Sequence, residues 1–141
     1  MLENTSIGLR EEIDGYVPKK RRGNPERAQQ KAVKDWLELV IPGCIVAATV
    51  NEQAAASLDP IKRARFGLAR KASGIVSGFP DLTVCLPGGR VVFIEMKSAT
   101  GRLNKNQKAL HPRLQALGHT VIVARDIDSA KAGLKAAGVL A

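Results

Sequence analysis

Aromatic residues and cysteines are scarce in this sequence, and it contains no long apolar run. Aromatic side chains make up 4% of the 141 residues, and the two cysteines, Cys44 and Cys85, belong to no CxxC motif or Cys/His cluster. Nothing therefore indicates a zinc site. No apolar stretch approaches the ~18 residues of a membrane span, and the polar N-terminus lacks the pattern of a signal peptide. We expect a cytoplasmic protein in which both cysteines are reduced and buried.

Acidic residues are also few. The chain has 22 Lys and Arg against 13 Asp and Glu, which gives a net charge of +9. A balance this basic points to a polyanionic partner, most often nucleic acid. A membrane surface is the main alternative, but the most basic stretch lacks the large aromatic face of an interfacial helix. We expect nucleic acid as the partner and no membrane association.

One long window of the chain is almost free of acidic residues. Between Pro60 and Arg125 only Asp81 and Glu95 are acidic, whereas twelve residues are Lys or Arg. Both carboxylates lie in apolar runs, where a charge is unfavourable unless it is used or paired. A solvated surface does not sort its charges in this way, so the two carboxylates indicate a site.

Hydrophobic periodicity and turn residues predict a helix, a strand, a helix, a β-hairpin, a helix, a strand and a helix. Strands are expected over 44–50, 82–86, 91–97 and 119–124, and helices between Asn24 and Pro42, between Asp59 and Gly74, over 104–117 and over 128–137. The strand over 91–97 is apolar on both alternating faces, which is typical of the centre of a sheet. The order predicts a single α/β domain over 24–141, with a mixed central sheet flanked by helices.

Residues 1–23 show little periodicity and end in the run PKKRRG, so we expect a flexible N-terminal arm ahead of the domain. Its basic residues fit phosphate contact, although a solvated tail has the same composition. The predicted helix after Asp59 is also basic, and it carries few aromatic side chains. Contact with the DNA backbone is therefore favoured over base stacking. The expected DNA-binding residues are Lys19, Lys20, Arg21, Arg22, Lys62, Arg63, Arg65, Arg70 and Lys71.

The two carboxylates belong to one predicted hairpin. Side chains alternate along a strand, so Glu95 and Lys97 project from the same face, and Asp81 begins the partner strand. Neighbouring carboxylates repel each other unless a cation lies between them, and oxygen ligands suit Mg²⁺ or Mn²⁺. Such an ion activates water at a phosphate, and Lys97 would orient that water or add positive charge. The alternative is a turn aspartate beside a structural Glu95–Lys97 ion pair.

The hairpin turn decides whether the two carboxylates meet. With Pro87-Gly88-Gly89 as a three-residue loop, Leu86 pairs with Arg90, and Asp81 lies opposite Glu95 on the same face. A loop that is one residue longer turns Asp81 to the other face, because a one-residue slip reverses every side chain. Only the shorter loop, or a bulge equivalent to it, builds one metal site, so we predict the register that it gives.

The pair Pro80-Asp81 followed by Glu95-x-Lys97 resembles the PD-(D/E)xK nuclease signature. The surrounding stretches GFPDL and EMKSATGRLNKNQ, with a helix and a strand after them, are similar to the VRR-NUC branch of that superfamily. The likeness covers about residues 26–134. It implies a restriction endonuclease-like fold and a small nuclease of a kind that occurs in phages and bacteria, or as a domain of larger repair enzymes.

By this resemblance, Glu26 on the first predicted helix adds an acidic ligand at the metal site, and Gln30 lies one turn later on the same face. Asn51 matches a polar position after the first strand, and Gln107 matches the glutamine that opens the third helix. Two of these residues have simpler interpretations. An acidic residue in a first helical turn is favoured by the helix dipole, and Gln107 also has capping-box spacing from the helix N-cap.

The expected function is a Mg²⁺- or Mn²⁺-dependent DNA endonuclease. By the resemblance alone, it would be a homodimer that cuts branched DNA such as Holliday junctions. The acidic members of the catalytic set are expected to hold the metal, and the full set is Asp81, Glu95, Lys97, Glu26 and Gln107. The alternatives are a flap- or restriction-like nuclease of the same fold, or an inert module that binds DNA or a partner. His111 and His119 show no suitable partner and are interpreted as ordinary residues.

Overall fold

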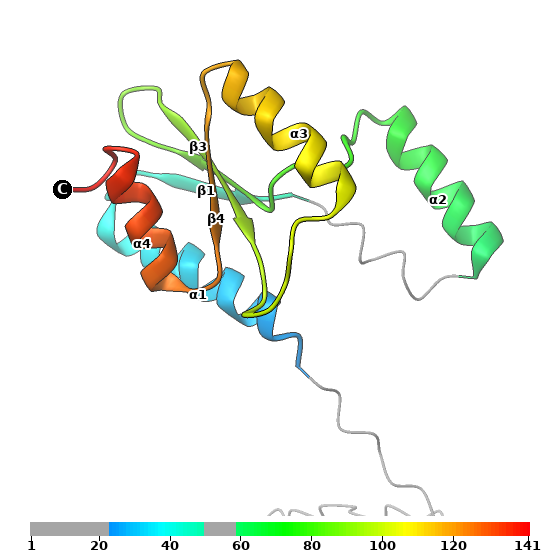
Figure 1. Cartoon of the computed structure of the whole chain (residues 1–141), viewed down its shortest axis with the longest axis horizontal. Helices are drawn as coiled ribbons and strands as arrows, with labels where there is room; N and C mark the ends of the chain where they lie inside the picture. Colours follow the sequence, from blue (N-terminus) through cyan, green and yellow to red (C-terminus); the bar gives the residue numbers. More distant parts are fainter. Residues whose placement is uncertain (1–22, 50–58) are drawn as a thin grey trace, which may run out of the picture.

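The structure, a computed structural model, describes residues 23–49 and 59–141 (Figure 1). The helices in this part of the chain are α1 (Pro25–Val40), α2 (Pro60–Ala72), α3 (Lys105–Ala116) and α4 (Ile127–Ala136). The strands are β1 (Ile45–Ala48), β2 (Leu82–Cys85), β3 (Val91–Met96) and β4 (Thr120–Ala124). The predicted order of elements is confirmed.

The strands form one mixed sheet in the order β1-β2-β3-β4. β1 and β3 both pair antiparallel with β2, and β4 pairs parallel with β3. β3 therefore lies inside the sheet, as its apolar residues on both faces predict. Its residues from Val92 to Met96 are all buried. The predicted α/β class with a mixed central sheet is confirmed.

The β2–β3 hairpin has the predicted register. Its loop closes with a hydrogen bond of 2.8 Å from Leu86 N–H to the carbonyl of Arg90, which leaves three residues in the turn. Both loop glycines have a φ of 84°, a left-handed conformation that residues with a Cβ rarely adopt. Continuing the ladder by one pair places Asp81 opposite Glu95. The three-residue loop is thus the feature that aligns the two carboxylates.

Helices cover both faces of the sheet, and the two faces differ in character (Figure 1). α1 and α4 pack on one face over the larger apolar core, which includes the fully buried Leu37, Ile94 and Leu134. α3 packs on the other face, where a smaller cluster surrounds Phe93 and Leu110. Because a fully buried Leu or Ile side chain contributes about 1.5–3 kcal/mol, the first face supplies most of the hydrophobic stabilisation.

α2 stands apart from the sheet and lies beyond the start of α3 (Figure 1). Asp59 caps it by accepting a hydrogen bond of 2.9 Å from Lys62 N–H, and Pro60 takes the first helical position, as predicted. Two of its apolar side chains, Ile61 and Leu68, are 68% and 69% exposed. Among the described helices, including α2, none is long and apolar enough to cross a membrane.

The prediction that both cysteines are buried is wrong. Both are free thiols, but Cys85 is exposed and Cys44 is half-buried. Cys85 ends β2, where the alternation of side chains turns it away from the core. Cys44 precedes β1 and packs against the edge of the core, with its Sγ 3.5 Å from the carbonyl oxygen of Leu37.

Candidate active site

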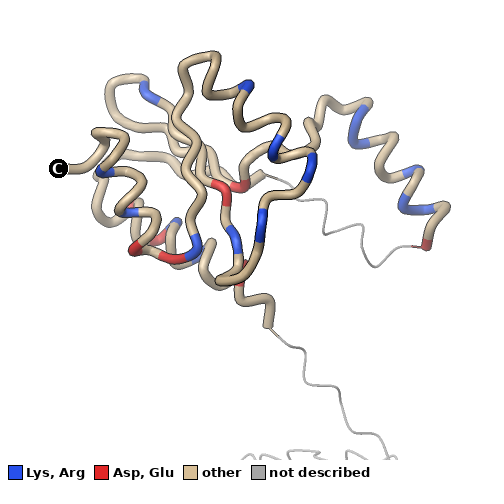
Figure 2. Tube along the Cα trace, viewed as in Figure 1, with Lys and Arg blue, Asp and Glu red and all other residues tan. Residues whose placement is uncertain are grey.

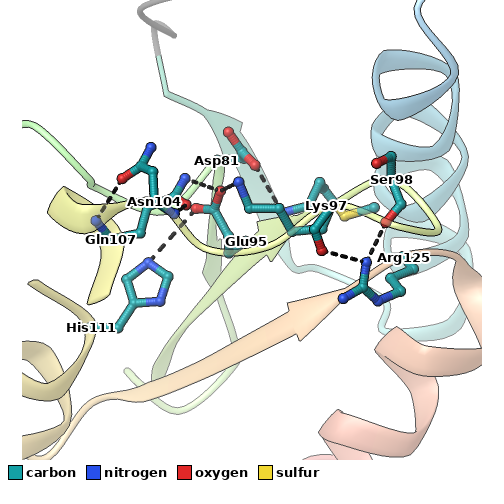
Figure 3. A network of polar contacts seen from close by, with 10 residues as sticks. Asp81, Glu95, Lys97, Ser98, Asn104, Gln107, His111 and Arg125 are labelled. Carbon is teal, nitrogen blue, oxygen red and sulfur yellow. Dashed lines mark hydrogen bonds and ion pairs between the residues drawn. The ribbon is translucent and has the colours of Figure 1, made fainter. Parts of the chain in front are cut away.

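The site lies on the α3 face of the sheet, where β2 begins and β3 ends (Figure 3). Glu95, near the end of β3, is 1% exposed, and Asp81, directly before β2, is 9% exposed. Asp81 Oδ2 accepts a hydrogen bond of 2.8 Å from Met96 N–H. The same carboxylate interacts with that of Glu95. The hairpin therefore brings both carboxylates together, as its register predicts.

The end of β1 fixes the backbone that carries Asp81. Thr49 N–H donates to the carbonyl of Asp81, and Thr49 Oγ1 donates to the carbonyl of Pro80, each at 2.8 Å. Pro80 is itself buried, and it has no backbone N–H that needs a partner. Both carbonyls around the Pro80–Asp81 step are thus satisfied, so the Asp81 side chain leaves a well-anchored backbone.

Gly78 brings the segment before Asp81 into close contact with α3. A Cβ at this position would lie 2.5 Å from the backbone carbonyl group of Asn106 and 2.8 Å from Gln107 N. Its φ of 82° is also left-handed. Only glycine satisfies both conditions, so the first turn of α3 can approach the site only because residue 78 has no side chain.

Three side chains surround the Glu95 carboxylate (Figure 3). Lys97, on the same face of β3 as predicted, has its Nζ 3.6 Å from Glu95 Oε1. Gln107 Nε2 donates a hydrogen bond of 2.6 Å to the same oxygen. His111 Nε2 lies 3.8 Å from Glu95 Oε2. Two of the three neighbours therefore come from α3, which faces the sheet at this point.

Gln107 takes part in two interactions at once. α3 begins with a capping box in which Gln107 N–H donates to Asn104 Oδ1, and Asn104 N–H donates to Gln107 Oε1, each at 2.9 Å. The side-chain nitrogen of Gln107 is left over and donates to Glu95. Because an amide side chain offers both an acceptor and a donor, one glutamine starts the helix and also holds the buried carboxylate.

The prediction that His111 has no suitable partner nearby is wrong. Its imidazole is 5% exposed and faces Glu95. The sequence did carry a signal, because His111 follows Gln107 by four residues, and residues four apart share one face of a helix. His119, in contrast, is exposed, and its ring packs edge-on against Phe93 with 5.4 Å between centroids.

The carboxylates of the site resist ionisation. Burial raises the pKa of Glu95 to about 8, and the neighbouring Asp81 carboxylate adds to this rise. Burial also raises the pKa of Asp81, against the opposing effect of the hydrogen bond from Met96 N–H. Burial lowers the pKa of His111. The single ammonium of Lys97 is thus not sufficient to bring the carboxyl groups back to their ordinary acidity.

The loop after Lys97 is anchored by Arg125, which follows β4 (Figure 3). Arg125 Nη1 donates to the carbonyl oxygens of Ser98 and Gly101, the latter at 2.9 Å. Because the guanidinium is always charged, it provides a permanent partner for two loop carbonyls. This anchor helps to set the position of Lys97 on one side of the loop and of α3 on the other.

Other predicted site residues are not joined to the pair by the described contacts. Glu26 and Gln30 are half-buried on α1. Within residues 23–49 and 59–141, no group of three or more His, Cys, Asp or Glu has the geometry to hold a metal ion. Glu26 as a further ligand therefore stays a prediction. Asn51 and the basic residues 19–22 lie outside the described residues.

The basic residues of α2 fall into two kinds. Lys62, Arg63, Arg65 and Lys71 are exposed. Arg70 is 9% exposed, and its guanidinium lies 5.4 Å from the centre of the Phe66 ring, a cation–π contact. A guanidinium buried in this way is poorly placed for phosphate contact, which departs from the expectation for this residue. Figure 2 shows Lys and Arg along α2 and along the loop between β3 and α3.

A model of the VRR-NUC domain family matches residues 23–126, from just before α1 to just after β4. The chain belongs to the VRR-NUC domain family. A similar protein of Acyrthosiphon pisum secondary endosymbiont phage 1, described as "Putative nuclease p44", is 36% identical over 81 residues. These residues span 50% of this chain and 87% of the phage protein.

Two solved structures have the same fold as this VRR-NUC chain. One, described as "VRR_NUC domain", has a TM-score of 0.56 and 23% identity, and the alignment covers 79% of this chain and 95% of the other. The second, described as "VRR_NUC domain protein", has a TM-score of 0.58 and 20% identity, and covers 82% and 88%. The predicted fold and the resemblance to VRR-NUC proteins are therefore confirmed.

The close approach at Gly78 leads to a first prediction. We expect Gly78→Ala to lower the free energy of unfolding by about 2–5 kcal/mol, since a left-handed alanine costs about 1–2 and overpacking about 1–3 kcal/mol. Gly74→Ala is the matched control, because Gly74 has a φ of 90° but no atom within 4 Å of the added Cβ. It should show the backbone cost alone. Urea unfolding measures the free energy of unfolding of both variants. Equal losses in Gly78→Ala and Gly74→Ala would contradict the close contact of Gly78 with α3.

The raised pKa of Glu95 leads to a second prediction. Between its ordinary value of 4.5 and about 8, folded Glu95 keeps a proton that the unfolded chain has lost, so its contribution to stability falls as pH rises. Without divalent metal, Glu95→Gln should therefore gain stability relative to the wild type as pH rises through this window. Urea unfolding at several pH values in chelator tests this. Asp128→Asn, on α4, is the control, and its free energy of unfolding should change with pH as that of the wild type does. If the free energy of unfolding of Glu95→Gln also runs parallel to that of the wild type over this pH range, the predicted effect is refuted.

Proposed function

We propose that this VRR-NUC chain is a divalent-metal-dependent endonuclease that hydrolyses phosphodiester bonds in DNA. The proposal rests above all on the placement of Asp81 and Glu95 together on one face of the sheet, with Lys97 beside them. Membership of the family and the description of the phage relative support nuclease activity. Branched DNA as the substrate, and a homodimer as the active form, follow from the family resemblance and belong to the proposal.

The two carboxylates fit a Mg²⁺ or Mn²⁺ ion. Both are buried with raised pKa values, so a further positive charge is needed before both are stable as anions. Carboxylate oxygens are the ligands that these ions prefer in proteins. When bound, such an ion supplies a water of lowered pKa and neutralises charge at the phosphate. We propose Asp81 and Glu95 as its ligands, with Glu26 as a further one.

The neighbouring side chains have roles that follow from their contacts. Lys97 keeps a compact positive charge 3.6 Å from Glu95 Oε1. From there it orients the attacking water or stabilises charge on the scissile phosphate. Gln107, through its bond of 2.6 Å, holds Glu95 in position. Both contacts are made to a carboxylate that lies beside a second one, Asp81, which favours a catalytic site over a lone structural ion pair.

The exposed basic side chains of α2 are proposed to bind the DNA backbone, together with the basic arm at residues 19–22. The aromatic residue of α2, Phe66, already contacts Arg70. Phosphate contact is thus favoured over the stacking of bases on this helix. Because α2 stands apart from the sheet, it can reach a stretch of backbone that the site itself does not contact.

Cleavage should require both the metal and the acidic pair. We expect the wild type to cut DNA in Mg²⁺ or Mn²⁺, and not in chelator. Asp81→Asn, Glu95→Gln and Lys97→Ala should each lower the rate at least about 100-fold, the scale of loss when one charge-stabilising group is removed. Labelled duplex, flap, fork and four-way junction DNAs measure the rate and the preferred substrate. Circular dichroism confirms that each variant is folded.

Two matched controls lie on α4, which covers the opposite face of the sheet. Asp128→Asn and Lys131→Ala remove an exposed carboxylate and an exposed ammonium, and both should cut at the wild-type rate. A folded Asp81→Asn variant that cuts as fast as the wild type would show that the proposed site is wrong. Binding without cleavage in any metal would favour the inert DNA-binding module instead.

The proposed contact of α2 with DNA makes binding sensitive to salt. The logarithm of the binding constant falls with the logarithm of salt concentration, with a slope of about −0.9 for each phosphate neutralised. Changing Arg63 and Arg65 together to Ala should flatten that slope by roughly two units. Arg70→Ala is the control, because its burial predicts little change in slope. Fluorescence anisotropy in Ca²⁺ measures binding, and an unchanged slope in the double variant would remove α2 from the interface.

A further inference from the structure

Two side chains of α3 lie next to the two oxygens of the Glu95 carboxylate. Gln107 reaches Oε1 at 2.6 Å, and His111, one turn later, approaches Oε2 to 3.8 Å. All three side chains are buried. Strand β3 places the backbone of Glu95, and the two side chains from α3 lie one at each oxygen of its carboxylate.

The imidazole of His111 is fixed at its other nitrogen. His111 forms a hydrogen bond with the backbone of Gly78. Since its Nε2 has no hydrogen-bond partner, this bond belongs to Nδ1. The ring is therefore oriented by Gly78 so that Nε2 is directed at the carboxylate, the arrangement by which outer partners orient the ligands of metal sites.

The facing atoms of His111 and Glu95 have no other partner. Nε2 and Oε2 are both buried, and neither makes a hydrogen bond within the described residues. A buried polar atom without a partner is unfavourable by roughly 1–3 kcal/mol. At 3.8 Å the two atoms are too far apart for a hydrogen bond, but after a small approach one hydrogen between them would satisfy both. His111 and Glu95 can therefore satisfy each other, and the packing of α3 keeps the two side chains opposite each other.

We propose that His111 is a positioning residue that orients the Glu95 carboxylate for the site. This inference rests on the proposed function, because it concerns a carboxylate that we assign as a metal ligand. His111 itself touches neither metal nor DNA in this proposal. The competing explanation is purely structural, namely that His111 serves only to hold the turn at Gly78 against α3.

Two substitutions at His111 separate these explanations. The amide nitrogen of asparagine lies about where Nδ1 of histidine lies, so His111→Asn keeps a donor for Gly78 but loses the contact with Glu95. The amide nitrogen of glutamine extends about as far as Nε2, so His111→Gln keeps a hydrogen between residue 111 and Glu95 but loses the contact with Gly78. The positioning role and the structural role therefore predict opposite results for the two variants.

Mn²⁺ affinity provides the test. Titration followed by the electron paramagnetic resonance of free Mn²⁺ should show affinity 10–100-fold weaker in His111→Asn, the usual loss when a partner of a metal ligand is removed. His111→Gln should stay within about threefold of the wild type. In metal-free protein, both variants should melt below the wild type, because each leaves a buried polar group of Glu95 or Gly78 without its partner, so the difference in Mn²⁺ affinity between them carries the test. His119→Asn and His119→Gln, at an exposed histidine with no described contact to Glu95, are the matched controls and should leave Mn²⁺ affinity unchanged.

The opposite pattern would overturn the proposal. If His111→Asn binds Mn²⁺ as tightly as the wild type, or if His111→Gln binds as weakly as His111→Asn, His111 does not position Glu95. If the wild type binds no Mn²⁺, the proposed function fails, and a metal-free measurement decides the role of His111. The side-chain amide signals of Gln107 in nuclear magnetic resonance spectra should then shift in His111→Asn and stay in place in His111→Gln. Unchanged signals in both variants would refute positioning.

Discussion

Two carboxylates buried side by side are the constraint on which the rest of this protein depends. Glu95 is almost fully removed from solvent, and Asp81 makes its ionisation harder still. Such a pair weakens the folded state when both groups are ionised. The opposite face of the sheet, under α1 and α4, carries the larger apolar core and offsets that cost. The face under α1 and α4 therefore stabilises the fold, and this stability offsets the cost of burying two carboxylates on the face under α3.

Several segments around Asp81 and Glu95 hold the two carboxylates and their neighbours in position. The end of β1 holds the backbone at Asp81 through Thr49, and Arg125 anchors the loop between β3 and α3. Gly78 lets α3 approach closely enough for its side chains to reach Glu95. These supports come from segments far apart in the chain and converge on one end of β3. Preorganisation of this kind is what an active site needs, because charged groups then lose no free energy by reorienting during the reaction.

The features that were predicted from the sequence are those fixed by local chemistry. A turn with two glycines sets the hairpin register and with it the opposition of Asp81 and Glu95, and apolar residues on both faces place β3 inside the sheet. The features that were missed depend on how separate elements dock. His111 gains its partner only when α3 packs on the sheet, and Arg70 is buried by contacts that a count of charges along α2 does not contain. Cys85 is exposed because of its place at the strand end, although its apolar neighbours suggested burial.

Gln107 couples the folding of a helix to the chemistry of the site. Its carbonyl oxygen closes the capping box of α3, and its nitrogen, on the same rigid amide, binds Glu95. The two interactions share one side chain, so the free energy of starting α3 and that of orienting Glu95 cannot vary independently. Thermodynamic linkage makes this coupling reciprocal. A ligand that tightens the hold on Glu95 also suppresses fraying at the start of α3, and fraying there weakens the site, so this helix end and the carboxylate form one cooperative unit.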